Sequence, residues 1–532
     1  MFSRFINLEL SRNKQTVINI IASMLNMAVT TLIGFVLSPY IVSTLGVEAN
    51  GFVSLANSFI SYISLAATAL NSMGSRFLMM AYYNGKQEKF CRYYSSLFFA
   101  NLLLAVVFGL MGAVCVWKLE LFLQIPAELV TDVKMLFALL FTNFVISTMI
   151  TVWTTAPFIK NRLYLNSITT ASGASIRAIL ILSLFLCLEP SVSFLGIATL
   201  VSGCVGYGLQ FLYKRSLFPE LRAQFKDFSW ATIWELVSSG IWNTVSSVGY
   251  ILTSGVDLLV ANLFVSAKAM GVLSLAHTMP SFVNTLNETI ANIFTPSLII
   301  DYAQGNTDSL VKTIKQSAKI ISVVCSLPLG FLLVYGEEFY TLWQPTEDAR
   351  VLYLLSVILI FGRVFFTGMQ PLFSVFTVVN KVKENSFVTI ANGFASVGLM
   401  YLFLKFTDLG VYAIAGASVV CCFFKNVLFV IPFSAKYLGL KPTAFYSVVT
   451  PSVACCAILV AWGCVEKLFL KPTSWMGLIC AGIVFVAVGV CLTVFTVLNK
   501  NEREYFVKML CRKFAQKKRD KKGALHGSGI CK

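Results

Sequence analysis

Charged residues are scarce in this sequence. Asp, Glu, Lys and Arg together make up 12% of its 532 residues, whereas a soluble chain carries about 25%. Apolar residues take their place: 57% of the chain is hydrophobic, and the mean hydropathy is +0.79. No water-soluble fold could cover that much apolar surface. The composition therefore excludes a soluble globular protein and indicates an integral membrane protein.

Residues that carry enzyme chemistry are also few. The chain has two histidines, His277 and His526, and neither lies near a nucleophile or a metal-ligand set in the sequence. The 14 cysteines show no CxxC or Cys/His spacing, and most fall in apolar stretches, where a thiol behaves as a small hydrophobic group. No loop is long enough to form a separate soluble domain. We therefore expect no catalytic site, no metal and no cofactor.

Long apolar runs dominate what is present. A helix needs about 20 residues to cross a hydrocarbon core of about 30 Å. Fourteen runs reach this length, which predicts an all-α membrane protein with about 14 transmembrane helices. The first run is too long for a removable signal peptide and lacks a cleavage site, so it is interpreted as the first span. The predicted spans cover residues 15–44, 51–81, 95–117, 133–158, 163–187, 192–213, 235–263, 270–300, 318–336, 351–378, 386–404, 409–434, 444–465 and 474–498.

The positive charges test this count independently, because cytoplasmic loops of membrane proteins hold an excess of Lys and Arg. Of the 41 Lys and Arg residues, 30 fall on the side of the N-terminus, seven on the opposite side and four within spans. The acidic residues divide evenly between the two sides. This distribution places both chain ends in the cytoplasm. It also explains the net charge of +17 as a topology signal with a basic tail, so nucleic-acid binding is not indicated.

A weak internal repeat divides the spans. Shifting the sequence by 220 residues aligns GFVSLAN at 51–57 with GVLSLAH at 271–277, and it carries the first span onto the seventh. Because six is an even number of spans, the two halves share one orientation, as parallel repeats in transporters do. We therefore expect two six-helix lobes with a cleft between them, and two further helices at the C-terminus.

The expected organisation has six parts. Residues 1–14 suit a short helix on the cytoplasmic membrane surface. The basic residues 499–532 suit a cytoplasmic tail in contact with anionic headgroups, although a plain topology anchor explains them equally well. Between these ends we expect the N-lobe with spans 1 to 6 at 15–213, an inter-lobe linker at 214–234, the C-lobe with spans 7 to 12 at 235–434, and spans 13 and 14 at 435–498.

Two stretches carry a family resemblance. Residues 38–85, from SPYIV to YYNG, fill the region of spans 1 and 2, and GVDLLVANLF at 255–264 ends span 7. Both are similar to the corresponding segments of the Wzx-like polysaccharide flippases, a family of the multidrug/oligosaccharidyl-lipid/polysaccharide exporter superfamily. The resemblance implies a MATE-like fold and transfer of an undecaprenyl-pyrophosphate-linked oligosaccharide, a repeat unit of capsule, exopolysaccharide or O-antigen, across the bacterial cytoplasmic membrane by alternating access. It also implies membrane lipids and polysaccharide assembly proteins as partners.

Six ionisable side chains lie inside the predicted spans. Each costs at least about 2.5–3.5 kcal/mol on insertion scales, so such groups usually face a cavity or a partner. Their net charge is +2, which suits a pyrophosphate, because Arg donates bidentate hydrogen bonds to phosphate oxygens. The six are Arg76, Arg177, Arg363, Lys425, Asp257 and Glu288.

The four basic residues are the predicted substrate contacts. Arg177 and Arg363 lie near the middle of their spans, where transporter sites concentrate; pairing with a helix carbonyl or an acid is the structural alternative. Arg76 lies near the cytoplasmic end of span 2, where snorkelling to the headgroups also explains it. Lys425 lies in the inner half of span 12.

The two acidic residues have different predicted roles. Glu288 lies within a polar stripe at helical spacing, and we expect it to be a coupling-ion ligand or a salt-bridge partner of an Arg across the cleft. Asp257 is a second candidate for that role, but a solvated helix end explains its position as well. The stripe comprises Asn284, Asn287 and Asn292, and three other uncharged polar residues could meet sugar hydroxyls or other helices: Asn71, Asn143 and Asn243.

Competing functions make different demands on the sequence. A multidrug exporter of the same superfamily would share the lobes and the repeat, but it would have fewer spans and an acidic pocket for cationic drugs. A membrane-embedded polysaccharide polymerase or ligase would need catalytic groups on a sizeable outer loop, and a channel would need a filter loop. The sequence therefore favours a flippase over an enzyme.

Overall fold

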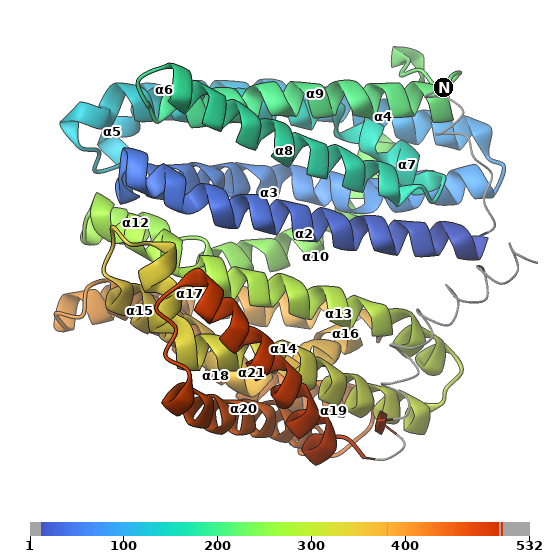
Figure 1. Ribbon diagram of the computed structural model, residues 1–532. Coiled ribbons are helices and arrows are strands. Elements are labelled where there is room, and N and C mark those ends of the chain that lie inside the picture. Colours follow the sequence, from blue (N-terminus) through green and yellow to red (C-terminus); the bar gives the residue numbers. More distant parts are fainter. Residues whose placement is uncertain (1–11, 380, 500–501, 504–532) are drawn as a thin grey trace, which may run out of the picture. The chain divides into compact units, whose positions relative to one another are not determined.

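The computed structural model describes residues 12–379, 381–499 and 502–503, which form helices and short connections between them (Figure 1). Thirteen helical stretches in this part of the chain are long and apolar enough to cross a membrane. They coincide with thirteen of the fourteen predicted spans. The predicted all-α membrane fold is confirmed.

The remaining predicted span, 270–300, is built differently. The chain divides at His277 into α12 (Ala267–Ala276) and α13 (Thr278–Ala303). Polar residues such as Asn284 and Glu288 lower the hydropathy of α13, so it is not among the thirteen apolar stretches. The side chain of Asn292, which the sequence places in the polar stripe, lies outside the described residues.

The chain forms two compact units. Unit 1 comprises Met1–Thr278, Thr346–Asp348 and Val382–Cys421, and unit 2 comprises Met279–Pro345, Ala349–Lys381 and Cys422–Lys532. The units follow contacts between helices, whereas the lobes expected at 15–213 and 235–434 follow the repeat. The lobe boundaries therefore stay a prediction.

Each unit is a bundle of long helices joined by short turns. Unit 1 contains α2 (Arg12–Leu45), α3 (Val47–Tyr83), α4 (Gln87–Trp117), α5 (Leu119–Phe122), η1 (Ala127–Leu129), α6 (Val130–Ile150), η2 (Thr151–Thr154), α7 (Thr155–Ile159), α8 (Leu163–Cys187), α9 (Ser193–Leu217), η3 (Phe225–Asp227), α10 (Trp230–Ser254), α11 (Asp257–Phe264), α12, α17 (Val382–Phe406) and most of α18 (Val411–Lys425). Unit 2 contains α13, α14 (Thr307–Trp343), α15 (Ala349–Phe366), η4 (Thr367–Met369), α16 (Gln370–Val378), η5 (Asn426–Val430), α19 (Ile431–Tyr437), η6 (Tyr446–Val448), α20 (Val449–Phe469) and α21 (Trp475–Val497).

Small residues bring the helices of unit 1 together. The two glycines that the 220-residue repeat aligns meet directly: a Cβ on Gly51 of α3 would lie 2.8 Å from the Cα of Gly271 in α12, and a Cβ on Gly271 would lie 2.4 Å from the carbonyl oxygen of Val47. Asn50 also donates to Ser274 across this crossing, at 3.1 Å. Close backbone approach at small residues is the usual basis of helix association in lipid, where apolar burial supplies little driving force.

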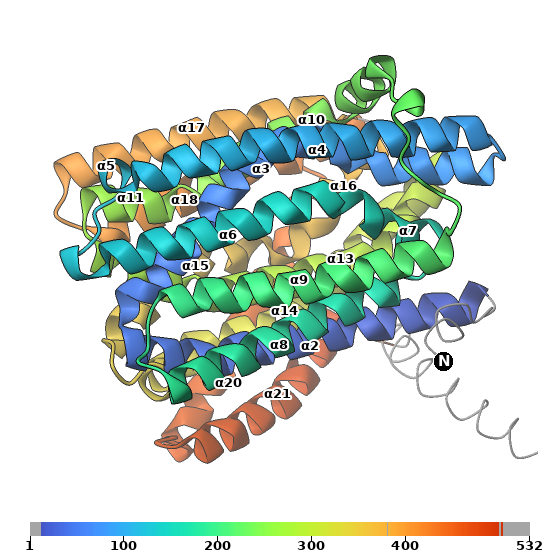
Figure 2. The same ribbon diagram turned by 90° about the horizontal axis from the view of Figure 1, so that it is seen from above.

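In unit 2 the long helix α14 lies side by side with α20 and α21 (Figure 1 and Figure 2). Hydroxyls join the first two of these helices, since Ser322 and Ser452 lie 2.9 Å apart. The ring of Phe485 from α21 packs edge-on against Phe331 of α14, with 5.6 Å between ring centres. These contacts make α14 the central helix of its unit.

Several transmembrane stretches of the described chain are interrupted. An irregular turn divides each of them, and in two cases a charged residue lies immediately beside it. Broken helices expose backbone groups that lipid cannot satisfy, so they occur where protein or a water-filled cavity covers them. The interruptions are the 3₁₀ turn Thr151–Thr154, the break between α10 and α11, the break between α12 and α13, the 3₁₀ turn Thr367–Met369 and the π-helical turn Asn426–Val430.

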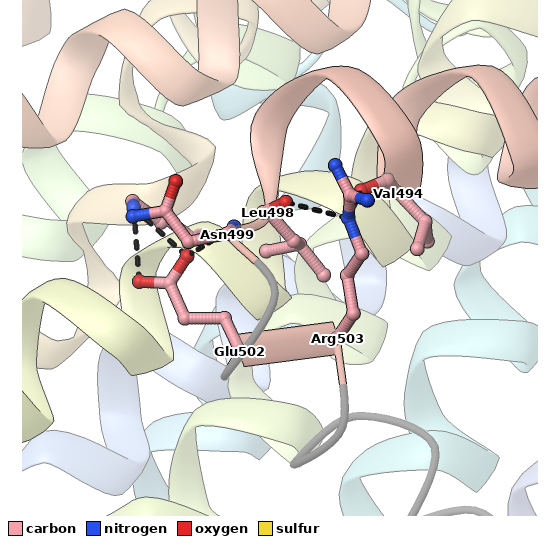
Figure 3. Close-up of polar contacts among 6 residues, drawn as sticks. Val494, Leu498, Asn499, Glu502 and Arg503 are labelled. Atoms are coloured by element: carbon pink, nitrogen blue, oxygen red, sulfur yellow. Dashed lines mark hydrogen bonds and ion pairs between the residues drawn. The ribbon is translucent and has the colours of Figure 1, made fainter.

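The end of α21 is closed by a side chain from the residues that follow it (Figure 3). Arg503 donates from Nε to the carbonyl oxygens of Leu498 at 2.7 Å and Val494 at 3.2 Å, so a cation meets the negative end of the helix dipole. Glu502 accepts from the backbone N–H of Asn499 at 2.9 Å and pairs with Lys319 of α14 at 2.9 Å. Glu502 and Arg503 are thereby fixed to unit 2.

Candidate functional site

Three side chains of unit 2 form a polar chain. Arg363 of α15 donates from Nη1 to Oδ1 of Asn284 in α13 at 2.7 Å, and Asn284 donates from Nδ2 to Oε1 of Glu288 at 3.0 Å. Asn284 and Glu288 are four residues apart and therefore share a face of α13. The structure thus brings together a predicted substrate contact and the predicted acidic partner, with an amide between them.

The guanidinium of Arg363 keeps unused donors. Its Nε is buried and has no hydrogen-bond partner among the described residues. Arg carries five N–H donors in a fixed fork, and the contact with Asn284 uses one of them. Arg363 as a whole is half-buried, and a guanidinium with spare donors is suited to an anion that brings several acceptor oxygens.

The backbone just after Arg363 explains how the side chain is positioned. The hydroxyl of Thr367 donates to the carbonyl oxygen of Arg363, and the 3₁₀ turn Thr367–Met369 follows. Gly368 donates from its backbone N–H to Oγ of Ser452 at 2.9 Å, and a Cβ at this position would lie 2.4 Å from Oγ of Ser322. The turn is therefore held against α14 and α20.

Lys425 belongs to the same part of unit 2. It is the last residue of α18, immediately before the π-helical turn Asn426–Val430. Lys425 and Arg363 both lie within electrostatic range of Cys422. Rings of α15 and α18 also meet, with 5.3 Å between the centres of Phe366 and Phe423. Two of the four predicted basic contacts are therefore neighbours.

Arg177 and Arg76 lie in unit 1. Arg177 of α8 is half-buried, and it has no hydrogen-bond or ion-pair partner among the described residues; its Nε is fully covered. Arg76 is exposed on α3. We call Arg363, Asn284, Glu288 and Lys425 the Arg363 group. No described contact joins Arg177 or Arg76 to this group, so their role as substrate contacts stays a prediction.

Asp257 lies in a setting that the sequence did not indicate. It is 4% exposed and begins α11, directly after the break that follows α10. Its Oδ1 accepts from the backbone N–H of Leu258 at 2.9 Å, and its Oδ2 lies 2.7 Å from Nε2 of His277, which stands at the break between α12 and α13. The interpretation as a solvated helix end is wrong, because the carboxylate is buried and paired across two interrupted spans.

The uncharged polar residues mostly join helices. Asn71 and Asn101 exchange two amide hydrogen bonds, of 2.8 Å and 3.0 Å, between α3 and α4. Tyr207 donates to Oδ1 of Asn143 at 2.7 Å, which links α9 to α6. These amides are engaged within unit 1 and are poor candidates for sugar contacts.

Sequence reasoning missed one buried carboxyl. The predicted span 444–465 ends just before Glu466, but α20 continues to Phe469 and leaves Glu466 only 3% exposed. Glu466 lies four residues after Trp462 and so shares a face of the helix with it. This spacing is the signal that could have extended the predicted span. Within the described ranges, no three His, Cys, Asp or Glu side chains are grouped to hold a metal ion.

The sequence of this chain is similar to that of a bacterial membrane protein. No family model matches the chain. It is 28% identical over 499 residues to the membrane protein EpsK of Bacillus subtilis (strain 168), a protein described as uncharacterized, and the match covers 92% of this chain and 97% of EpsK.

Two solved structures show the same fold. The lipid II flippase MurJ, in an inward closed conformation, superimposes with a TM-score of 0.67 at 13% identity, over 90% of this chain and all of MurJ. A multidrug resistance MATE family transporter of the MOP superfamily, facing inward, gives a TM-score of 0.60 at 16% identity, over 80% of this chain and 98% of that one. The chain therefore has a MATE/MurJ-like membrane fold.

Proposed function

We propose that this protein is a transporter that moves an undecaprenyl-pyrophosphate-linked oligosaccharide across the bacterial cytoplasmic membrane by alternating access. The similarity to EpsK over nearly the whole chain supports a role shared with that membrane protein. The MATE/MurJ-like fold supports transport, and the flippase MurJ supplies a precedent for a lipid-linked substrate on this fold.

The observation that carries the proposal is the Arg363 group in unit 2. Arg363 has unused N–H donors inside a membrane-spanning bundle, and Lys425 is a second cation within electrostatic range of the same residue, Cys422. The acidic partner Glu288 reaches Arg363 only through Asn284. One pyrophosphate oxygen would accept from Nε, and a second would take the place of the Asn284 amide on Nη1, so the headgroup would use two donors of the guanidinium.

The test is export of surface glycan in a strain that lacks the native gene. Arg363→Gln removes the charge and the fork, so export should fall about tenfold to hundredfold, the equivalent of one charged hydrogen bond of about 1.5–3 kcal/mol. Arg363→Lys keeps the charge but loses the planar fork of donors, so its export should lie between that of the wild type and that of Arg363→Gln. Lys312→Ala, at an exposed position of α14, is the matched control. Unchanged export by Arg363→Gln at equal protein level contradicts the proposal.

A multidrug exporter is the second candidate, because MATE family transporters share the fold. The Arg363 group argues against it, since two cations and one carboxylate would repel a cationic drug. Drug susceptibility of the same deletion strain separates the two functions: a strain that loses glycan but keeps its drug tolerance supports the flippase.

We also propose that the protein lies in the cytoplasmic membrane with both ends in the cytoplasm. The excess of Lys and Arg on the side of the N-terminus supports this orientation. Lys319 and Arg503, which hold the end of α21, belong to the same basic side. Glu288 remains the proposed site of ion coupling or of a salt bridge that forms when no substrate is bound.

A further inference from the structure

A buried carboxyl without a partner lies at the far end of α20. Glu466 is 3% exposed, and neither of its carboxylate oxygens has a hydrogen-bond partner among the described residues. Burial of an ionised carboxylate is unfavourable unless the charge is paired and hydrogen-bonded. Glu466 therefore needs a positive charge that the surrounding protein does not supply.

Other unpartnered polar atoms surround Glu466 where α20 meets α14. The hydroxyl of Tyr335, Oε2 of Glu338 and the indole Nε1 of Trp462 are all buried and without a partner in the described chain. Glu466 and Glu338 both act electrostatically on Tyr335. The two helices are in close contact here, because a Cβ on Gly463 would lie 2.8 Å from a methyl group of Val334.

The cation next to Glu466 in the sequence, Lys467, is already engaged. Lys467 lies 2.5 Å from Oε1 of Glu338, and it donates to the carbonyl oxygen of Val334 at 2.9 Å. Helix α21, which also packs on α20, carries no charged residue. Tyr335 of α14 and Tyr353 of α15 both interact electrostatically with Glu338 of α14 and Cys464 of α20, Tyr353 also with Glu337 of α14, and Tyr335 also with Glu466. Arg350 of α15 and Lys467 of α20 are the cations at these ends of the two helices.

We propose that Glu466 is a proton-binding site. Its carboxylate accepts a proton from a hydronium ion and releases water, and the neutral acid is the form that packs between α20 and α14. A metal ion fits less well, since Ca²⁺ takes about six to eight oxygen ligands and the ammonium of Lys467 stands beside Glu338. In the orientation proposed above this end of α20 faces the outside, so the proton comes from the outer side.

Ionisation of Glu466 then weakens the contact between α20 and α14. An ionised Glu466 is repelled by the carboxylate of Glu338, which acts on the same tyrosine, Tyr335, and the outer end of α20 separates from α14. Glu466 lies on α20, whereas Arg363 and its partners lie on α15 and α13. The proton site requires no particular substrate. It can therefore hold even where the proposed glycan transport fails.

Infrared spectroscopy of the full-length protein in lipid nanodiscs tests the site. The wild type should show the C=O stretch of a protonated carboxylic acid at pH 7, and Glu466→Gln, which keeps the shape, should lose that band. Glu337→Gln, an exposed neighbour on α14, should retain it. If Glu466→Gln does not fold, Glu466→Asp should shift the band instead of removing it.

Two results overturn the proposal. One is a band that is absent from the wild type or that persists unchanged in Glu466→Gln. The other is a band that disappears when sodium chloride is added at constant pH, because a metal cation would then compete for the carboxylate. Export of glycan is measured separately, so failure of the proposed function leaves the infrared result unaffected.

Discussion

At the scale of single residues, Arg363 keeps hydrogen-bond donors that no described residue uses. Arg363 gives one donor to Asn284 and retains Nε, and Glu288 is reached only through the same amide. An incoming phosphate can therefore replace a neutral hydrogen bond and need not break a direct ion pair. A contact of this kind holds the arginine in position and still leaves it available for an anion.

A residue outside the spans gives a pH-dependent prediction. Burial raises the pKa of the Glu347 carboxyl, Glu48 raises it further and Lys268 opposes both. The unfolded chain ionises this carboxyl at lower pH than the folded protein does. Its contribution to stability is therefore complete below about pH 4.3 and is lost as the pH rises through the folded pKa.

Glu347→Gln removes that dependence. The melting temperature of the variant should exceed that of the wild type at pH 7, and the two should converge at about pH 4. Thermal unfolding in detergent at both pH values measures this. Glu220→Gln, at an exposed position of the linker between α9 and α10, should show no such difference. A constant offset at both pH values contradicts the assignment to ionisation.

At the scale of elements, the interrupted spans are connected to one another. Asp257 follows one break and His277 forms another, and the 2.7 Å contact between them joins α11 to the end of α12. Tyr62 of α3 donates to the carbonyl oxygen of Gly255 in the first break. The carbonyl oxygen of Gly255 and the carboxylate of Asp257 therefore both have partners. Polar groups at interrupted helices in a membrane require such partners.

Removal of one member of this pair should be costly. His277→Ala removes the contact to Oδ2 of a carboxylate that is 4% exposed, so the free energy of unfolding should fall by about 1–3 kcal/mol. The double variant Asp257→Asn, His277→Ala should recover part of that loss, because no charge remains buried. Thermal unfolding of the two single variants and the double variant measures the coupling. Losses that simply add would show that the contact contributes nothing.

The crossing of α3 and α12 gives a steric prediction. Gly271→Ala places a Cβ 2.4 Å from the Val47 carbonyl oxygen, and backbone cannot move aside as a flexible side chain can. We expect a loss of about 1–3 kcal/mol from overpacking. Gly398→Ala in α17 has no atom within 4 Å of the new Cβ and should be neutral or stabilising. Equal melting temperatures for the two variants would remove the crossing as a constraint.

At the scale of the whole molecule, the topology is the most direct claim to check. Alkaline phosphatase fused after Lys471, between α20 and α21, should be active because the enzyme folds only outside the cytoplasm, whereas a fusion after Asn306, between α13 and α14, should be inactive. The alternation of Lys and Arg between the two sides is the reason. Fluorescent protein fusions at the same two positions should give the opposite pattern. Two active phosphatase fusions would refute the orientation.

Much of the fold could be predicted from the sequence, because apolar length and loop charge are local properties. The interruptions could not, since the turn at Thr367–Met369 depends on hydroxyls from Ser322 and Ser452, far away in the chain. Arg363 and Glu288 were identified as candidates by charge alone, but the Asn284 bridge depends on how α13 meets α15. Glu466 was missed because a hydropathy boundary fell one residue before it.

The meeting of Gly51 and Gly271 has a consequence for how such a chain can diverge. A shift of 220 residues aligns these glycines, one in each predicted half of the chain. A side chain on Gly51 would need the space of the Gly271 Cα, and one on Gly271 would need the space of the Val47 carbonyl, four residues before Gly51. A larger residue in one half is therefore tolerated only after a compensating change in the other. Among homologues the two positions should vary together, so two halves that could have drifted apart remain tied by a single shared contact.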